Sequence, residues 1–245
     1  RDCSFKFPYI DLNTKDMLIV KSLKVGYDFQ LIPDVSFHLG STSKIWIRGT
    51  NGVGKTTLLK TLMRKIPSLG GSFNFHPAAK IGYIEQELGF ENGNLSAYNV
   101  YLNAFPRCSQ KEVRSALATV GLAGELAVKP VSTLSGGEMM RLKLAVLCNS
   151  PSNILILDEP TNFVDNKFEK ELYEILTSLN DRMAIVMVSH DLGTITSYVK
   201  SIVCVNRTVH RHNTNNITPE QLANYNCPIQ LITHGDVPHT VLKRH

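Results

Sequence analysis

Short apolar runs rich in β-branched residues alternate with helical patterns along most of the chain. Apolar runs bounded by turn residues are typical of strands, whereas apolar residues spaced at helical intervals are typical of helices. The pattern predicts strands at residues 17–25, 30–39, 44–48, 73–75, 80–84, 154–157, 183–188 and 201–205, and helices at about 55–64 and 167–179. Strands that alternate with helices favour an α/β fold with a mainly parallel sheet, in which we expect the first two strands to pair antiparallel.

The strand pattern stops between residue 84 and about residue 130. Ser109 and Glu112 have the spacing of a capping box, in which each side chain bonds the backbone N–H of the other at the start of a helix. Val113, Leu117 and Val120 then share one face of that helix. We therefore expect a helical lobe at residues 87–149. It is inserted into an α/β core made of residues 1–86 and 150–205, with an N-terminal antiparallel β subdomain.

Composition places the chain among folded globular proteins, since 43% of the residues are apolar and 19% are charged. The apolar runs are far shorter than the ~20 residues of a membrane span, so any transport pathway must lie in other chains. The net charge of +5 permits contact with nucleic acid or an anionic surface without arguing for either. The five cysteines are scattered without a CxxC spacing, which is typical of reduced thiols in the cytosol.

The two ends of the chain differ from the rest. Neither an initiator methionine nor an apolar signal segment is present at the start, which is consistent with a fragment of a longer chain. Residues 206–245 hold five of the eight histidines and are expected to form a small C-terminal appendage with its own composition. These histidines fit either solvated side chains or zinc ligands.

The segment Gly49-Thr50-Asn51-Gly52-Val53-Gly54-Lys55-Thr56 matches the pattern GxxxxGK[ST] between a predicted strand and a predicted helix. Glycines let such a loop curl so that its backbone N–H groups point inward, and the following helix adds its positive end, which makes a pocket for phosphate oxygens. Lys55 is then expected to reach the β- and γ-phosphates, and the Thr56 hydroxyl to bind Mg²⁺. An incidental glycine-rich turn is the alternative interpretation.

The apolar run at residues 154–157 ends in two carboxylates, Asp158 and Glu159. A buried strand places its C-terminal residues at the edge where α/β sheets bind ligands. Asp158 is therefore expected to hold Mg²⁺ through water, and Glu159 to face the γ-phosphate as the general base for the attacking water. A solvated turn at the end of the strand is the alternative.

The segment Leu134-Ser135-Gly136-Gly137-Glu138 opens a further helix. Serine is a common helix cap, but this helix start also fits a second phosphate cradle made of the Ser135 hydroxyl and the Gly137 backbone. One site does not need two cradles. The duplication is explained if Ser135 and Gly137 of one molecule close over a nucleotide held by another.

In this order, the phosphate loop (Walker A), the signature at residues 134–138 and the carboxylate strand end (Walker B) resemble the ATP-binding cassette (ABC) superfamily. The resemblance implies a P-loop NTPase fold, Mg²⁺ and ATP as ligands, and hydrolysis of ATP to ADP and phosphate by cassettes paired head to tail. It assigns Gln86 to the Q-loop that senses Mg²⁺ and the attacking water, His190 to the switch histidine, and Asp165 to the D-loop at the dimer interface. Tyr27 stands where the family has an aromatic residue that stacks on adenine, and an ordinary strand-end aromatic is the alternative.

These motifs and the resemblance define the predicted site. We expect catalytic roles for Glu159, His190 and Gln86, and metal contacts from Thr56, Gln86 and Asp158. The expected nucleotide contacts are Tyr27, Gly49, Asn51, Gly52, Gly54, Lys55, Thr56, Thr57, Ser135 and Gly137.

Different parts of the chain resemble two different subfamilies. Residues 5–162 are similar to the second cassette of ABC-F proteins, which are cytosolic ATPases that act at the ribosome. The similarity lies in Phe7-Pro8-Tyr9-Ile10, Trp46-Ile47-Arg48-Gly49-Thr50-Asn51-Gly52, Ile81-Gly82-Tyr83-Ile84-Glu85-Gln86-Glu87 and Glu159-Pro160-Thr161-Asn162. The last third is similar to the ATPase subunit of zinc and manganese uptake transporters, in Glu169-Lys170-Glu171-Leu172-Tyr173, Ser189-His190-Asp191-Leu192-Gly193 and His234-Gly235-Asp236-Val237-Pro238-His239. Between them, Phe163-Val164-Asp165 replaces the His-Leu-Asp that is usual in ABC-F proteins.

We therefore interpret the chain as a mosaic whose two parents share the same ATP chemistry. The expected partners are a second ABC cassette, in the same or a different chain, and the ribosome if the protein is ABC-F-like. The alternative is the ATPase subunit of a zinc or manganese importer, whose partner is a membrane permease. We expect a cytoplasmic location, peripheral to the inner face of the membrane in the importer alternative.

Overall fold

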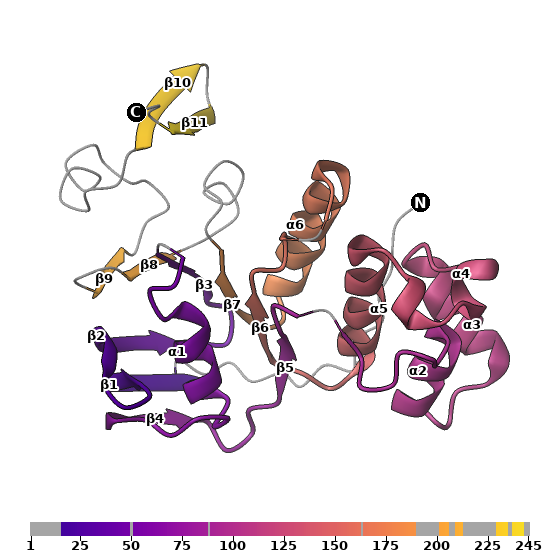
Figure 1. The fold of residues 1–245 in the computed structure, drawn as a ribbon, viewed down its shortest axis with the longest axis horizontal. Coiled ribbons are helices and arrows are strands. Elements are labelled where there is room, and N and C mark those ends of the chain that lie inside the picture. Colours follow the sequence, from indigo (N-terminus) through magenta and orange to yellow (C-terminus); the bar gives the residue numbers. More distant parts are fainter. Residues whose placement is uncertain are drawn as a thin grey trace.

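The computed structural model describes residues 16–49, 51–87, 89–162, 164–189, 201–205, 209–212, 229–234 and 237–242 (Figure 1). Its strands are β1 (Leu18–Gly26), β2 (Gln30–Leu39), β3 (Lys44–Arg48), β4 (Gly70–Phe75), β5 (Ile81–Ile84), β6 (Ile154–Asp158), β7 (Ala184–Val188), β8 (Ser201–Val205), β9 (Val209–His212), β10 (Ile229–His234) and β11 (Val237–Leu242). Its α-helices are α1 (Lys55–Leu62), α2 (Ala97–Ala104), α3 (Gln110–Thr119), α4 (Glu125–Val128), α5 (Gly136–Asn149) and α6 (Asn166–Asn180).

The larger sheet has the strand order β5-β6-β7-β3-β8-β9 and is parallel except for the last strand. Its register aligns the carboxyl ends of the central strands. Ile84 lies beside Leu157, and Val188 lies between Asp158 on one side and Ile47 on the other. The loops that follow β3, β5, β6 and β7 therefore start at one edge of the sheet, where α/β proteins bind their ligands.

The central strands are buried on both faces because successive side chains point to opposite sides of the sheet. Ile45 and Ile47 of β3 pack with α1 and with the antiparallel sheet. Trp46, between them in sequence, packs with α5 and α6 on the other face. Two apolar layers thus enclose the sheet, and no charged residue can stand in the middle of these strands at low cost.

The single tryptophan of the chain also makes a polar contact inside this core. The Trp46 side chain is fully buried, and its indole Nε1 donates to the backbone carbonyl of Ser189 at 3.1 Å. The Arg48 guanidinium lies 6.0 Å from the centre of the ring. The indole therefore joins β3 to the residue that directly follows β7.

A second, antiparallel sheet has the order β2-β1-β4 and covers one face of the larger sheet together with α1. The β1–β2 turn carries two exposed aromatic side chains, Tyr27 and Phe29. Only glycine fits at position 26, because a Cβ there would lie 2.0 Å from the Phe29 carbonyl oxygen. Gly26 thus fixes the turn that presents both rings.

The helices α2, α3, α4 and α5 gather at the side of the molecule away from the antiparallel sheet (Figure 1). They enclose a third apolar cluster, which includes Val113, Leu117 and Leu142. The capping box predicted at Ser109 and Glu112 is present at the start of α3. Ser135 and Glu138 form a second capping box at the start of α5.

Several elements differ from the sequence predictions. The helix predicted at 55–64 ends at Leu62. Arg64 has a φ of 57°, which a right-handed helix does not allow. Helix α2 was not predicted, although Ser96 caps it. Strand β4 starts at Gly70, three residues before the predicted start, because β1 pairs with Gly70 and Ser72 as well as with Phe73. The hairpin of β10 and β11 was also unexpected. The segment Thr218-Pro219-Glu220, whose sequence is typical of a helix start, lies outside the described residues.

Within the part of the chain that the structure describes, every helix is too short or too polar to cross a lipid bilayer.

The conformation of Gly54 gives a first testable prediction. Gly54 precedes α1 in the left-handed region with φ 109°, and a Cβ there would lie 3.1 Å from Ile32 Cγ2. Gly54→Ala should therefore lower the free energy of unfolding by about 1–3 kcal/mol, measured by circular dichroism in urea. Gly89→Ala is the matched control, because a Cβ at Gly89 meets nothing within 4 Å. Equal stability of the two variants would show that the backbone before α1 is not restrained as described.

Candidate functional site

Five of the predicted residues meet at the carboxyl edge of the parallel sheet. Gly49 follows β3, and Lys55 and Thr56 start α1. Asp158 ends β6, and Glu159 directly follows it. The Thr56 hydroxyl donates to Asp158 Oδ1 at 3.2 Å, and Lys55 Nζ lies 3.5 Å from Glu159 Oε1. Lys55 Nζ also donates to the Gly49 carbonyl oxygen at 2.9 Å. The first turn of α1 and the end of β6 thus form one polar cluster.

The charged groups of this cluster are withdrawn from solvent. Lys55 and Glu159 are each only 6% exposed, and Asp158 is 1% exposed. Burying an isolated charge in this way is costly. The attraction between the opposite charges of Lys55 and Glu159 offsets part of that cost. A bound phosphate has to compete with the Glu159 carboxylate for the Lys55 ammonium.

The surroundings of Asp158 fit those of a cation ligand. Burial raises the pKa of Asp158 above its usual 3.8, the Thr56 hydrogen bond lowers it, and the nearby Glu159 carboxylate raises it again. Its Oδ2 atom is buried and has no hydrogen-bond partner among the described residues. Hydroxyl and carboxylate oxygens are the ligands that Mg²⁺ prefers. The pair Thr56 and Asp158 therefore fits the magnesium position expected from the sequence.

Glu159 is held in an unusual backbone conformation. Its φ is 49°, in the left-handed region that non-glycine residues rarely adopt. Its N–H donates to the Val188 carbonyl at 2.9 Å, and its own carbonyl accepts from the Asn162 N–H at 3.2 Å. These bonds turn the chain sharply at the end of β6 and keep the carboxylate at the Lys55 ammonium. Strain of this kind is often retained at functional sites.

The segment that carries Gln86 leaves β5 beside this cluster. Gln86 itself is exposed. Two lysines, one that follows α1 and one on α5, hold its neighbours. Lys65, beyond the end of α1, forms an ion pair with Glu85, whose pKa this hydrogen bond lowers. Lys143 of α5 donates to the Glu87 carbonyl at 3.4 Å. The position of Gln86 is thus tied to both the core and the helical lobe.

The remaining predicted residues flank the cluster in sequence, lie on other elements or fall outside the described residues. Ser135 accepts a hydrogen bond from the Glu138 N–H, and a Cβ on Gly137 would touch Phe168 of α6. His190 lies outside the described residues. Of the other loop residues, Asn51 and Gly52 are exposed, and Thr57 is buried in α1.

The exposed aromatic residues of the β1–β2 turn include one that sequence reasoning missed. Tyr27 is 58% exposed and Phe29 is 70% exposed, so both rings are accessible for stacking. The position of Phe29, on the short turn between two predicted strands, was the available signal. All residues of the polar cluster at Lys55 that have described contacts were predicted from the sequence.

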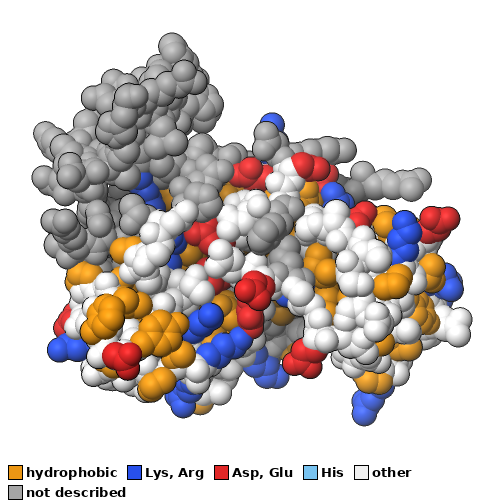
Figure 2. Space-filling model, viewed as in Figure 1, with side chains coloured by type: hydrophobic (Ala, Val, Ile, Leu, Met, Phe, Trp, Pro, Cys, Tyr) orange, Lys and Arg blue, Asp and Glu red, His pale blue; other side chains and the backbone are white. Residues whose placement is uncertain are grey.

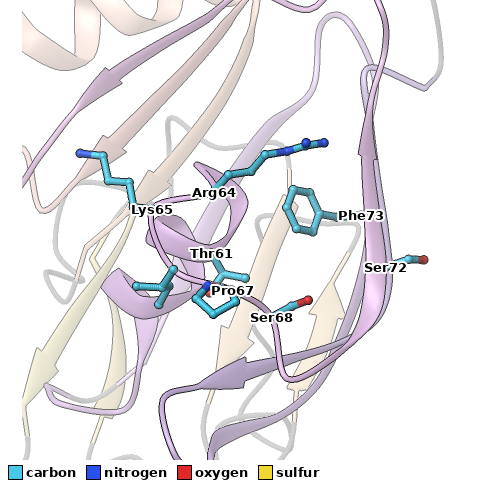
Figure 3. A pocket seen from close by; sticks show the side chains of 8 residues that line it. Thr61, Arg64, Lys65, Pro67, Ser68, Ser72 and Phe73 are labelled. Atoms are coloured by element: carbon cyan, nitrogen blue, oxygen red, sulfur yellow. The ribbon is translucent and has the colours of Figure 1, made fainter.

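A separate open groove of about 610 Å³ lies beyond the opposite end of α1 from the phosphate loop (Figure 3). Arg64, Lys65, Pro67 and Phe73 are among its lining residues. The two basic side chains point in opposite directions, with the Arg64 guanidinium 5.8 Å from the centre of the Phe73 ring. The groove is therefore distinct from the Lys55 cluster, because none of its lining residues belongs to that cluster.

On the visible face of the molecule, basic and acidic side chains are interspersed (Figure 2).

Comparison with known proteins agrees with this geometry. Residues 32–162 match the model of the ABC transporter family. A probable metal transport system ATP-binding protein of Thermotoga maritima is 35% identical over 218 residues, which are 84% of this chain and 89% of that protein. ATP-binding cassette sub-family F member 3 of Mus musculus is 37% identical over 171 residues, which are 69% of this chain and 24% of the mouse protein. The chain spans about a third or less of the first curated relatives that it matches.

A solved structure shows the same fold. The dimeric ATP-binding cassette MJ0796, described in a post-hydrolysis state with ADP and Pi, has a TM-score of 0.70 and 22% identity, over 82% of this chain and 100% of that one. The predicted fold, a P-loop cassette with an antiparallel sheet beside a parallel one, is thereby confirmed. The chain belongs to the ABC transporter family and has the fold of its ATP-binding cassettes.

Proposed function

We propose that the protein binds MgATP at the Lys55 cluster and hydrolyses it in a head-to-tail pair of cassettes. The observation that carries this proposal is the convergence of Lys55, Thr56, Asp158 and Glu159 at one edge of the sheet. Phosphoryl transfer depends mainly on positioning and on charge stabilisation, which these four side chains supply together.

Each side chain has a distinct part in the proposed reaction. Lys55 neutralises the β- and γ-phosphates, and backbone N–H groups of the loop from Gly49 to Thr57 hold their oxygens. Glu159 accepts a proton from water while the water oxygen bonds to the γ-phosphorus and the bond to the bridging oxygen of ADP breaks. Thr56 and Asp158, with Gln86, hold Mg²⁺, which when bound stabilises the negative charge on the phosphates. We further propose that Tyr27 stacks on adenine and that His190 contacts the γ-phosphate.

The pairing of cassettes is proposed because the second phosphate cradle stands on the helical lobe. Ser135 and Gly137 begin α5, whose described contacts are with the lobe, with α6 and with the sheet. They would close over the nucleotide of another cassette. This assigns ATP binding to residues 1–86 and 150–205, the signature to residues 87–149, and an auxiliary role to residues 206–245.

For the biological role we propose an ABC-F-like cytoplasmic protein that works at the ribosome. The motifs in residues 5–162 and the similarity to the mouse sub-family F protein support this role. The alternative is a metal-importer subunit, because the Thermotoga relative is named for metal transport and is covered almost along its whole length. The permease of such an importer would then be the partner.

Removal of the Lys55 ammonium tests the phosphate site. Lys55→Ala should abolish ATP turnover and weaken nucleotide binding, because no other described side chain of the cluster carries a positive charge. Isothermal titration with ATP and a phosphate-release assay measure the two effects. Lys111→Ala, an exposed lysine of α3, is the control. Wild-type turnover by Lys55→Ala would rule out the assigned site.

Replacing the proposed general base tests the pairing. Glu159→Gln should lower turnover by about 10²- to 10⁴-fold, while ATP and Mg²⁺ trap a closed pair. Light scattering after size exclusion measures the mass with and without ATP, and Glu125→Gln at an exposed position of α4 is the control. A Glu159→Gln protein that stays monomeric at high concentration would argue against pairing with itself and would point to a different second cassette.

The same trapped variant distinguishes the two biological roles. Glu159→Gln with ATP should sediment with ribosomes through a sucrose cushion, whereas Lys55→Ala should remain in the supernatant. Recovery only with membranes that contain a metal permease would instead support the importer alternative.

A further inference from the structure

Arg141 joins three helices at the border between the helical lobe and the core. It stands on α5, six residues after Ser135, which is a rise of about 9 Å along the helix. Its Nη2 donates to Glu171 Oε2 of α6 at 2.9 Å, and its Nη1 donates to the Val120 carbonyl at 3.4 Å. Its guanidinium carbon lies 4.5 Å from the centre of the Phe168 ring. Figure 1 shows α5 between α6 and the other lobe helices, as these contacts require.

Phe168 connects this guanidinium with both segments that are proposed to reach another cassette. Its ring is 3% exposed and belongs to the apolar layer under α5 and α6. A Cβ on Gly137 would lie 3.9 Å from Phe168 Cδ1, so the ring faces the start of α5. The Phe168 N–H donates to Asp165 Oδ1 at 2.8 Å, which caps α6. The Phe168 ring thus faces the signature, while its backbone N–H holds the D-loop aspartate.

The end of α3 leaves room for the guanidinium. Gly121 has a φ of 78°, and a Cβ there would lie 3.0 Å from Arg141 Nη1. The Val120 carbonyl is at the negative end of α3, where a cation is favourable. Only a planar group with several donors can stack on Phe168 and bond both Glu171 and Val120, so lysine is not an equivalent.

We propose that Arg141 is a positioning residue for the cross-cassette reaction. Together with Phe168 and Glu171 it keeps two segments of one cassette, residues 135–137 and Asp165, at a fixed distance from each other. Both segments then reach the nucleotide of the other cassette as a single rigid unit. This inference rests on the proposed head-to-tail hydrolysis. It predicts that the loss of Arg141 harms the paired state and spares nucleotide binding by the single cassette.

Steady-state kinetics test this split. Arg141→Ala should lower kcat by about 10- to 100-fold through misplacement of these groups, with nearly unchanged ATP affinity, because Lys55 and Thr56 stand on α1. Arg141→Lys should recover little of the loss. Arg114→Ala is the matched control, since Arg114 of α3 also lies over a ring, that of Tyr98, at 5.6 Å. Wild-type kcat in Arg141→Ala, full recovery in Arg141→Lys, or an equal loss of nucleotide affinity would each overturn the proposal.

Hydrogen exchange on the nucleotide-free chain keeps this result separate from the proposed function. Arg141→Ala should speed amide exchange at residues 136–138 and at Phe168 together, with β6 unchanged. If the wild-type protein had no ATPase activity, the proposed function would be refuted. Faster amide exchange at both segments in Arg141→Ala would still support the coupling between them. Exchange that rises at only one of the two segments, or at neither, would overturn the coupling whatever the ATPase activity.

Discussion

The burial of the central strands on both faces is the constraint on which the proposed nucleotide site depends. A strand enclosed by two apolar layers can place charged groups only at its ends. Because β3, β6 and β7 run parallel in register, their carboxyl ends meet at one edge. The residues that follow Ile47, Leu157 and Val188 therefore converge, and the chain concentrates its polar chemistry there.

At that edge two buried side chains of opposite charge face each other. The 3.5 Å contact between Lys55 and Glu159 joins a buried ammonium to a buried carboxylate. Either charge alone would be expensive at this depth. Nucleotide binding must replace one partner of the Lys55 ammonium by phosphate, which would release the Glu159 carboxylate toward the water it is proposed to activate. Asp158, beside them, keeps an unpartnered oxygen for a cation.

The sequence predicts the parts of the site that are local, and it predicts poorly what depends on distant contacts. The phosphate loop and the Asp158–Glu159 strand end are short patterns set by glycine geometry and apolar runs, so they could be recognised before the fold. Helix α2 could not, since it has few buried residues and Ser96 lacks a glutamate three positions on. The proposed role of Arg141 was hidden as well, because its partners lie on α6 and at the end of α3, far from it in the sequence.

The placement of Trp46 gives this protein a spectroscopic reporter of its own. It is the only tryptophan of the chain, so the intrinsic emission excited at the red edge of the indole band comes from one site. That indole bonds to the Ser189 carbonyl, on the residue directly before the proposed switch histidine. Any shift of the segment after β7 changes the environment of the indole. Movements that accompany nucleotide turnover can therefore be followed optically without a dye, an engineered cysteine or any change to the sequence.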